Sequence, residues 1–215
     1  MPPGRHRIRL VGAEAEPSWL GAVLDAYAVV DADVERVVAL RVRGGESLAC
    51  VAGCFQCCIQ PVPLTKYEIM AIGWYLAHGA VPGALDAVAA ARHRRGGSWA
   101  CPMLQDGGCV AYPVRPIACR RFNVLGRPCL VGEITEATRP GDMLAPGEGA
   151  LRRAMALLLP LAGVAPKDMR RALDERLLHN EAVLIQGVDW EAVVQGVTQG
   201  RQGVDGGLRE KIHAG

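Results

Sequence analysis

The stretch "ACVAGCFQCCIQPVPLT", residues 49–65, places four cysteines within nine positions, and two of them, Cys57 and Cys58, are adjacent. A packed core has no use for thiols at this density, because reactive thiols oxidise or exchange unless something holds them. Disulfides, a bound metal, or a redox cycle between thiol and disulfide would each hold them. This stretch therefore predicts that the middle of the chain is organised by its cysteines.

A second block of cysteines follows, and all eight cysteines of the chain lie between residues 50 and 129. The spacing is C-x3-C-x2-C-C, then a gap, then C-x7-C-x9-C-x9-C. Two residues between Cys54 and Cys57 allow a tight turn that aims both sulfurs at one metal. Confinement to two blocks indicates one shared task, and the candidate metal ligands are Cys50, Cys54, Cys57, Cys58, Cys101, Cys109, Cys119 and Cys129.

Composition and charge exclude several classes of protein. The chain has 215 residues, half of them hydrophobic, and a formal net charge of +2, too small to indicate nucleic acid or an anionic membrane as partner. The N-terminal segment lacks the apolar core of a signal peptide, and the most apolar run, 154–165, is too short to cross a bilayer and contains Pro160. We therefore expect a cytoplasmic protein, in which clustered cysteines favour metal binding or catalysis over structural disulfides.

Apolar periodicity predicts helices on both sides of the cysteines. The N-terminal helix, 17–43, opens at Pro17 and stops at Gly44-Gly45. A second helix begins at Thr65, which has the spacing of a capping box with Glu68, and ends at Gly79. Further helices are expected at 84–95, 148–159, 167–186 and 190–198, the last with Asp189 as its N-cap.

The fold class that follows is mainly α, in one domain. The cysteine region, 46–131, contains the Gly- and Pro-rich part of the chain, which excludes long helices there. Metal binding would supply the order that regular structure does not. The expected organisation is the N-terminal helix at 17–43, this metal-stapled region, C-terminal helices within 146–199, and a loose tail at 200–215.

The spacing also predicts how the ligands combine. In an extended backbone, neighbouring side chains face opposite ways, so Cys57 and Cys58 are expected to diverge. Gaps of seven and nine residues in the second block are too long for local chelating pairs. We therefore expect mixed sites with ligands from both blocks, and Cys54 close to Cys119.

At "CVAYPVRPIACRRF", residues 109–122, the second block resembles a known family. With "CFQCC" (54–58), "CPML" (101–104) and Cys129, it is similar to the CxxCxxCC cysteine-cluster family of the YkgJ type, described as zinc- or iron-chelating. The resemblance covers about residues 50–130 and implies metal chelation without a defined reaction. One departure is the spacing of Cys50 and Cys54, with three residues between them where the family has two.

Four arginines lie among the late cysteines and could offset the negative charge of a thiolate site by donating N–H groups to sulfur. Arg115 and Arg120 match the family's string, and we expect this role of them. For Arg121 and Arg127, we weigh this role equally against that of ordinary surface arginines.

Three functions fit these patterns. The leading hypothesis is a cytoplasmic metal-binding protein with a cysteine-ligated zinc or iron centre, the iron form including an iron–sulfur cluster. The second is a zinc-stapled structural or interaction module without catalysis, and the third is a thiol–disulfide or metal-trafficking protein. The partners expected are a metal ion and an unidentified protein, without nucleic acid or membrane, and the sequence leaves open whether the chain is an enzyme.

Overall fold

The computed structural model describes residues 17–51, 53–93, 100–144 and 146–200. It is mainly α-helical, as predicted, with two small sheets among the described residues. Of the predicted tail, 200–215, only Gly200 is among the described residues. The elements are α1 (Ser18–Arg43), β1 (Pro63–Leu64), α2 (Lys66–His78), α3 (Ala84–His93), β2 (Leu104–Gln105), β3 (Gly108–Cys109), α4 (Ile117–Arg121), α5 (Thr135–Thr138), α6 (Glu148–Leu158), α7 (Met169–Asp174), α8 (Leu177–Asn180), β4 (Val183–Leu184) and α9 (Trp190–Thr198).

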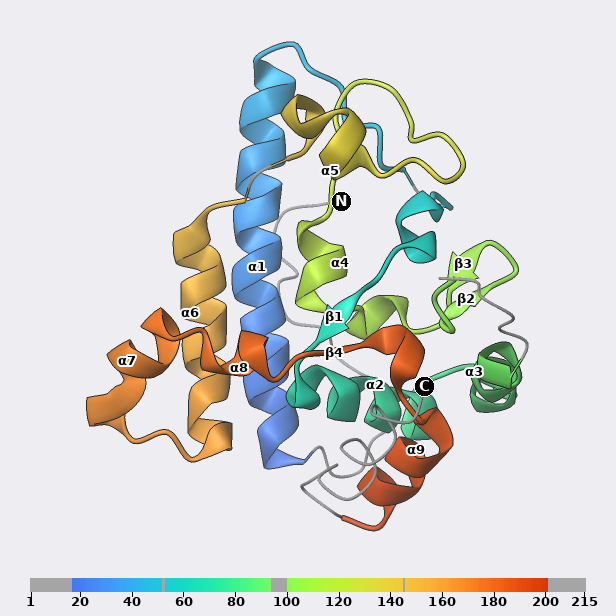
Figure 1. The fold of residues 1–215 in the computed structure, drawn as a ribbon, viewed down its shortest axis with the longest axis vertical. Coiled ribbons are helices and arrows are strands. Elements are labelled where there is room, and N and C mark those ends of the chain that lie inside the picture. Colours follow the sequence, from blue (N-terminus) through green and yellow to red (C-terminus); the bar gives the residue numbers. More distant parts are fainter. Residues whose placement is uncertain (1–16, 52, 94–99, 145, 201–215) are drawn as a thin grey trace.

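Helix α1 is the longest element, and it lies between α6 on one side and α4 on the other, as Figure 1 shows. Pro17 is its N-cap and Gly44 its C-cap, as predicted, and Gly45 takes a left-handed backbone with φ of 91°. Only the N-terminal half of α1 is buried, through Val30. Its C-terminal half extends beyond this packing, where Leu40 is exposed.

Helix α2 forms the other side of the core, where it packs against α9. The predicted capping box is present, with Thr65 N donating to Glu68 Oε2 at 2.9 Å. The helices approach closely at Gly73, because a Cβ atom there would lie 2.4 Å from Val193 Cγ1. Asp189 caps α9 as predicted, since its Oδ1 accepts from Ala192 N at 3.1 Å.

The two sheets are short antiparallel pairs. β1 pairs with β4, which ties the segment after the first cysteine block to the C-terminal region. β2 and β3 form a hairpin in which Leu104 pairs with Cys109. Asp106 and Gly107 connect these strands with φ of 48° and 76°, the positive values typical of a two-residue hairpin turn. The hairpin thus fixes the backbone on which Cys109 lies.

The prediction of a single helix over 167–186 is wrong. A 3₁₀ turn and α7 cover its first part, and Arg176 then takes a left-handed backbone with φ of 54°. For a residue other than glycine this backbone costs about 1–2 kcal/mol. It separates α7 from α8, and the chain continues as β4 because β1 offers an edge for pairing. The tertiary pairing overrides the local helical pattern here.

The apolar run at 154–165, which is too short to cross a bilayer, contains the end of a helix inside the protein. Helix α6 passes into a 3₁₀ turn, Leu159–Ala162, and Gly163 closes it with φ of 75°. Leu158 and Leu159 are buried. Nowhere in the described ranges is there a helix with the length and apolarity needed to span a membrane.

Candidate metal centre

The two cysteine blocks lie against each other. Cys101 N donates to the carbonyl oxygen of Cys58 at 2.6 Å, which joins the end of the first block to the start of the second. Farther along, Ala49 N donates to Val124 O at 2.8 Å, and Val124 N donates to Cys50 Sγ at 3.3 Å. The first block is therefore held beside the second at both of its ends.

The adjacent cysteines do not diverge, so that expectation is wrong. They lie in a 3₁₀ turn, Gln56–Ile59, and not in an extended strand. The hydrogen bond between their thiols lowers the pKa of Cys57 to about 7 and raises the pKa of Cys58. Cys57 is thereby prepared to ionise first, and the thiolate is the form that binds metal.

Electrostatic interactions link five cysteines from both blocks, and we call these five cysteines the inner group. Burial raises the pKa of Cys119, and the charges of Cys101, Cys57 and Cys109 raise it further. The pKa of Cys58 is raised mainly by the hydrogen bond with Cys57 and by burial. The charges of Cys101 and Cys109 raise it further. These mutual effects put the inner group in one electrostatic neighbourhood: Cys57, Cys58, Cys101, Cys109 and Cys119.

The remaining cysteines form an outer group of Cys50, Cys54 and Cys129. Burial raises the pKa of Cys50, and the charges of Cys54, Cys57 and Cys129 add to this increase. Cys54 is exposed, so the outer group reaches the surface. Cys54 is thus grouped with Cys50, and Cys119 with the inner group, while the approach of Cys54 to Cys119 stays a prediction.

No family model, curated protein or solved structure matches this chain.

All eight cysteines are free thiols. Within residues 17–51, 53–93, 100–144 and 146–200, no three or more His, Cys, Asp or Glu side chains are arranged to hold a metal ion. The site described here is therefore a gathering of thiols and not a formed coordination sphere. Its fit to a metal rests on the donor chemistry and on the groups around the sulfurs.

Arg115 lies among the inner thiols. Its positive charge lowers the pKa of Cys57, and it partly opposes the increases caused by burial at Cys109 and Cys119. The guanidinium lies over the Tyr112 ring, 4.5 Å from its centroid. Among the described residues, its buried Nε has no hydrogen-bond partner. An unpartnered buried donor is costly, so this N–H suits a further acceptor beside the thiols.

Arg120 was expected to donate N–H groups to sulfur. In the structure, its three side-chain nitrogens donate to oxygen atoms instead. Nε donates to Arg115 O at 2.7 Å, and Nη2 donates to Pro113 O at 2.7 Å. Nη1 forms an ion pair with Asp31 Oδ2 at 2.5 Å, and the guanidinium lies 4.1 Å from the centroid of the Tyr27 ring. Arg120 therefore fixes the backbone that carries Arg115 and attaches it to α1.

Glu68 attaches α4, which carries Cys119, to α2. Its buried carboxylate accepts from Thr65 N and Thr65 Oγ1, each at 2.9 Å, and from Ile117 N at 2.7 Å. Burial raises the pKa of Glu68, and these three hydrogen bonds oppose that increase. One carboxyl group thus caps α2 and satisfies the first amide of α4, an N–H without a partner inside the helix.

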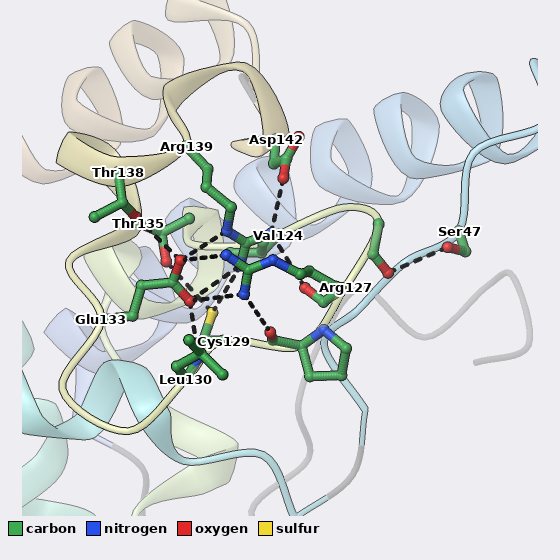
Figure 2. Close-up of polar contacts among 12 residues, drawn as sticks. Ser47, Val124, Arg127, Cys129, Leu130, Glu133, Thr135, Thr138, Arg139 and Asp142 are labelled. Carbon is green, nitrogen blue, oxygen red and sulfur yellow. Dashed lines mark hydrogen bonds and ion pairs between the residues drawn. The ribbon is translucent and has the colours of Figure 1, made fainter.

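Cys129 has polar partners that the sequence did not reveal. Figure 2 shows its sulfur beside Thr135 Oγ1, at 3.4 Å, and Arg139 Nη2, at 3.9 Å. Arg139 is only 10% exposed and forms ion pairs with Glu133 Oε1 at 2.8 Å and with Asp142 Oδ2 at 2.7 Å. No motif or spacing marks Arg139, whose role depends on the path of the loop between Cys129 and α5.

Glu133 is the centre of this loop. Its carboxylate accepts from Arg139, from Leu130 N at 2.8 Å, and from Thr138 Oγ1 at 3.0 Å. These bonds, with that from Arg139 foremost, lower the pKa of Glu133 to about 2, so the group stays charged at any physiological pH. Arg127 pairs with the same carboxylate at 3.1 Å, but its side chain is 52% exposed.

Arg139 and Arg127 offer a matched test of what holds Cys129. Arg139→Gln is expected to free the loop, because it removes the link from Glu133 to Asp142 and to the sulfur of Cys129. Hydrogen exchange at the Leu130 amide and alkylation of Cys129 should both become severalfold faster. Arg127→Gln should change either rate little, because exposed ion pairs contribute little. Equal effects of the two variants would contradict this assignment.

Proposed function

We propose that this chain is a metal-binding protein of a reducing compartment such as the cytoplasm, and that its cysteines hold zinc or iron, the latter alone or as an iron–sulfur cluster. The observation that carries the proposal is the electrostatic linkage of five thiols from both blocks, with the charge of Arg115, whose buried Nε has no partner among the described residues, acting on three of them. Buried thiols are otherwise inert hydrophobic groups that need no cation beside them.

The inner group gives the chemical reason. Burial holds most of these thiols protonated, and a bound metal would remove the protons because a coordinating thiol is deprotonated. Several thiolates around one divalent ion leave the site with negative charge, which Arg115 would offset. Its Nε would donate to a thiolate or, in an iron–sulfur cluster, to an inorganic sulfide.

The number of thiols supports two centres. A closed tetrahedral site takes four ligands. Cys58, Cys101, Cys109 and Cys119 would form the inner site, and Cys50, Cys54, Cys57 and Cys129 the outer one. Cys57 is assigned to the outer set because its charge acts on Cys50, and because each closed site then has four ligands. The hydrogen bond between Cys57 and Cys58 would then mark the boundary between the sites.

The test of the proposal is metal analysis of protein purified without oxygen. Brown protein with iron and acid-labile sulfide would identify an iron–sulfur centre, and colourless protein with stoichiometric zinc would identify a zinc protein. Metal-free protein that does not take up either metal, and whose thiols form reversible disulfides, would overturn the proposal in favour of thiol–disulfide chemistry.

Paired serine variants test the division into two sites. Cys54→Ser/Cys57→Ser and Cys58→Ser/Cys119→Ser should each lose about half of the metal, because each pair removes two ligands from one site of four. Cys57→Ser/Cys58→Ser, with the same number of substitutions, should lose nearly all of it. Equal loss in the three variants would mean one shared centre.

A zinc-stapled interaction module is a second candidate, and exposed apolar side chains favour it. Leu130, Val131 and Ile134, in the loop after Cys129, are 64%, 86% and 57% exposed. The loop is held to the first block, because Gln60 Nε2 donates to Glu133 O at 3.0 Å. Phe55, in that block, is also exposed. Apolar groups gathered beside an outer metal site would suit a protein partner.

A further inference from the structure

A groove lies among the C-terminal helices, lined by residues other than the cysteines. Its larger part, about 260 Å³, is lined by residues of α6, α7 and α8, which lie at the left of Figure 1 and in front of α1. A smaller part, about 110 Å³, reaches β1 and α4. The two parts share Leu151, Met155 and His179 in their walls, so they adjoin each other at these residues.

The larger part is apolar along one side. Leu159 at the end of α6, Leu173 on α7 and Leu177 on α8 line it with the two shared apolar residues. An opening of this size among aliphatic side chains suits a short aliphatic chain, and it is below the usual size of a drug-sized ligand pocket.

Arg176 lines the same cavity and has two unusual features. Its left-handed backbone is one of only two such conformations at non-glycine residues in the described part of the chain. Strained conformations of this kind persist where the surrounding structure or a function requires them. In addition, the Arg176 side chain has no hydrogen bond or ion pair within the described ranges.

Whereas the exposed guanidinium of Arg176 is open to water, Arg121, in the wall of the smaller part, supplies a buried donor without a partner among the described residues. Its Nη2 donates to Pro146 O at 3.3 Å, but its buried Nε lacks a partner among the residues described. Arg121 and Arg176 both lie near His179, since burial and then the charges of these two arginines lower the pKa of its imidazole. The neutral imidazole can donate one hydrogen bond and accept another.

The charge of the groove limits the ligand. Arg152 is neutralised by Asp174, 2.5 Å away. Glu148 lies in the wall of the larger part and Glu68 in the wall of the smaller part, so the lining has as many carboxylates as arginines. Glu68 accepts from the amides of Thr65 and Ile117, and Arg121 and Arg176 have no carboxylate partner among the described residues. A lining without net positive charge suits a monoanion better than a doubly charged phosphate ester.

We propose that this groove binds a small aliphatic carboxylate. The chain would lie between α6 and the pair α7 and α8, and the carboxylate would accept from Arg176 and Arg121 beside His179. The site is independent of the cysteines, so it holds whether or not the chain binds metal.

Titration of the purified full chain with hexanoate tests the proposed site. Calorimetry and the methyl NMR signals of Met155 and Leu173 detect the binding. Saturable shifts are expected, with hexan-1-ol binding at least about tenfold more weakly because it lacks the charge. Arg176→Gly should weaken hexanoate binding by about tenfold or more, yet keep or raise the melting temperature, because glycine accepts the left-handed backbone. Glu148→Gln should tighten binding by removing the opposing charge.

Arg171→Gln is the matched control, because Arg171 is an exposed arginine of α7 that does not line the groove. It should leave the affinity for hexanoate unchanged. Equal binding of hexanoate and hexan-1-ol, unchanged affinity in Arg176→Gly, or no saturable binding of hexanoate would each overturn the proposal.

Discussion

Removing metal from the reduced protein is expected to unfold the segment from Cys101 to Cys129 while the terminal helices remain folded. This segment contains only a two-residue-strand hairpin, a 3₁₀ turn and the five-residue helix α4. Structural zinc contributes about 10–16 kcal/mol to the folding of small metal domains, more than such short elements can replace. Trypsin should then cut at Arg120 and Arg121, the arginines of this segment that are not followed by proline, well before it cuts at Arg152 and Arg153 in α6.

The cleavage sites, identified by mass spectrometry, measure this effect together with the melting temperature. Chelator should be added with a thiol reductant, so that disulfides do not replace the metal. Returning zinc or iron should restore protection, which separates loss of metal from irreversible damage. If the metal-free protein keeps the same cleavage pattern and melting temperature, the metal does not hold this segment.

Glu68→Ala is expected to cost about 3–5 kcal/mol of unfolding free energy. The substitution leaves the amides of Thr65 and Ile117 buried without an acceptor, and each such group costs about 1–3 kcal/mol. It also opens a cavity in a fully buried place. Urea denaturation of the metal-loaded protein would measure the change. Because α4 carries Cys119, metal affinity should fall in parallel.

Glu68→Gln is the matched control, since its amide oxygen can still accept one of the two backbone hydrogen bonds. It should lose less than half as much stability as the alanine variant. A destabilisation below about 1 kcal/mol in Glu68→Ala, within the range of ordinary surface substitutions, would show that the amides find other partners.

Much of the helical framework was predictable because its signals are local. Pro17, Gly44, the Thr65–Glu68 capping box and Asp189 mark helix ends through backbone chemistry that needs no distant partner. The mainly α fold follows from these elements. The concentration of all cysteines in one region was also visible, and the structure brings the two blocks into contact.

What the sequence did not show depends on distant partners. The break at Arg176 follows from the pairing of β4 with β1, which no local pattern near residue 176 reveals. Arg139 approaches Cys129 only because Glu133 and Asp142 hold it there. One missed element had a local signal: Asp106-Gly107 is a typical hairpin turn.

The hydrogen bond from Cys101 to Cys58 has a consequence for biosynthesis, because α2 and α3 lie between these residues. At roughly 5–20 residues per second, Cys129 leaves the ribosome roughly 4–16 s after Cys50. During this interval the early thiols have emerged while the residues that complete both proposed sites are still being made. Loading of the proposed metal sites is therefore expected to be a late event in the maturation of this chain, after helix α2 has formed.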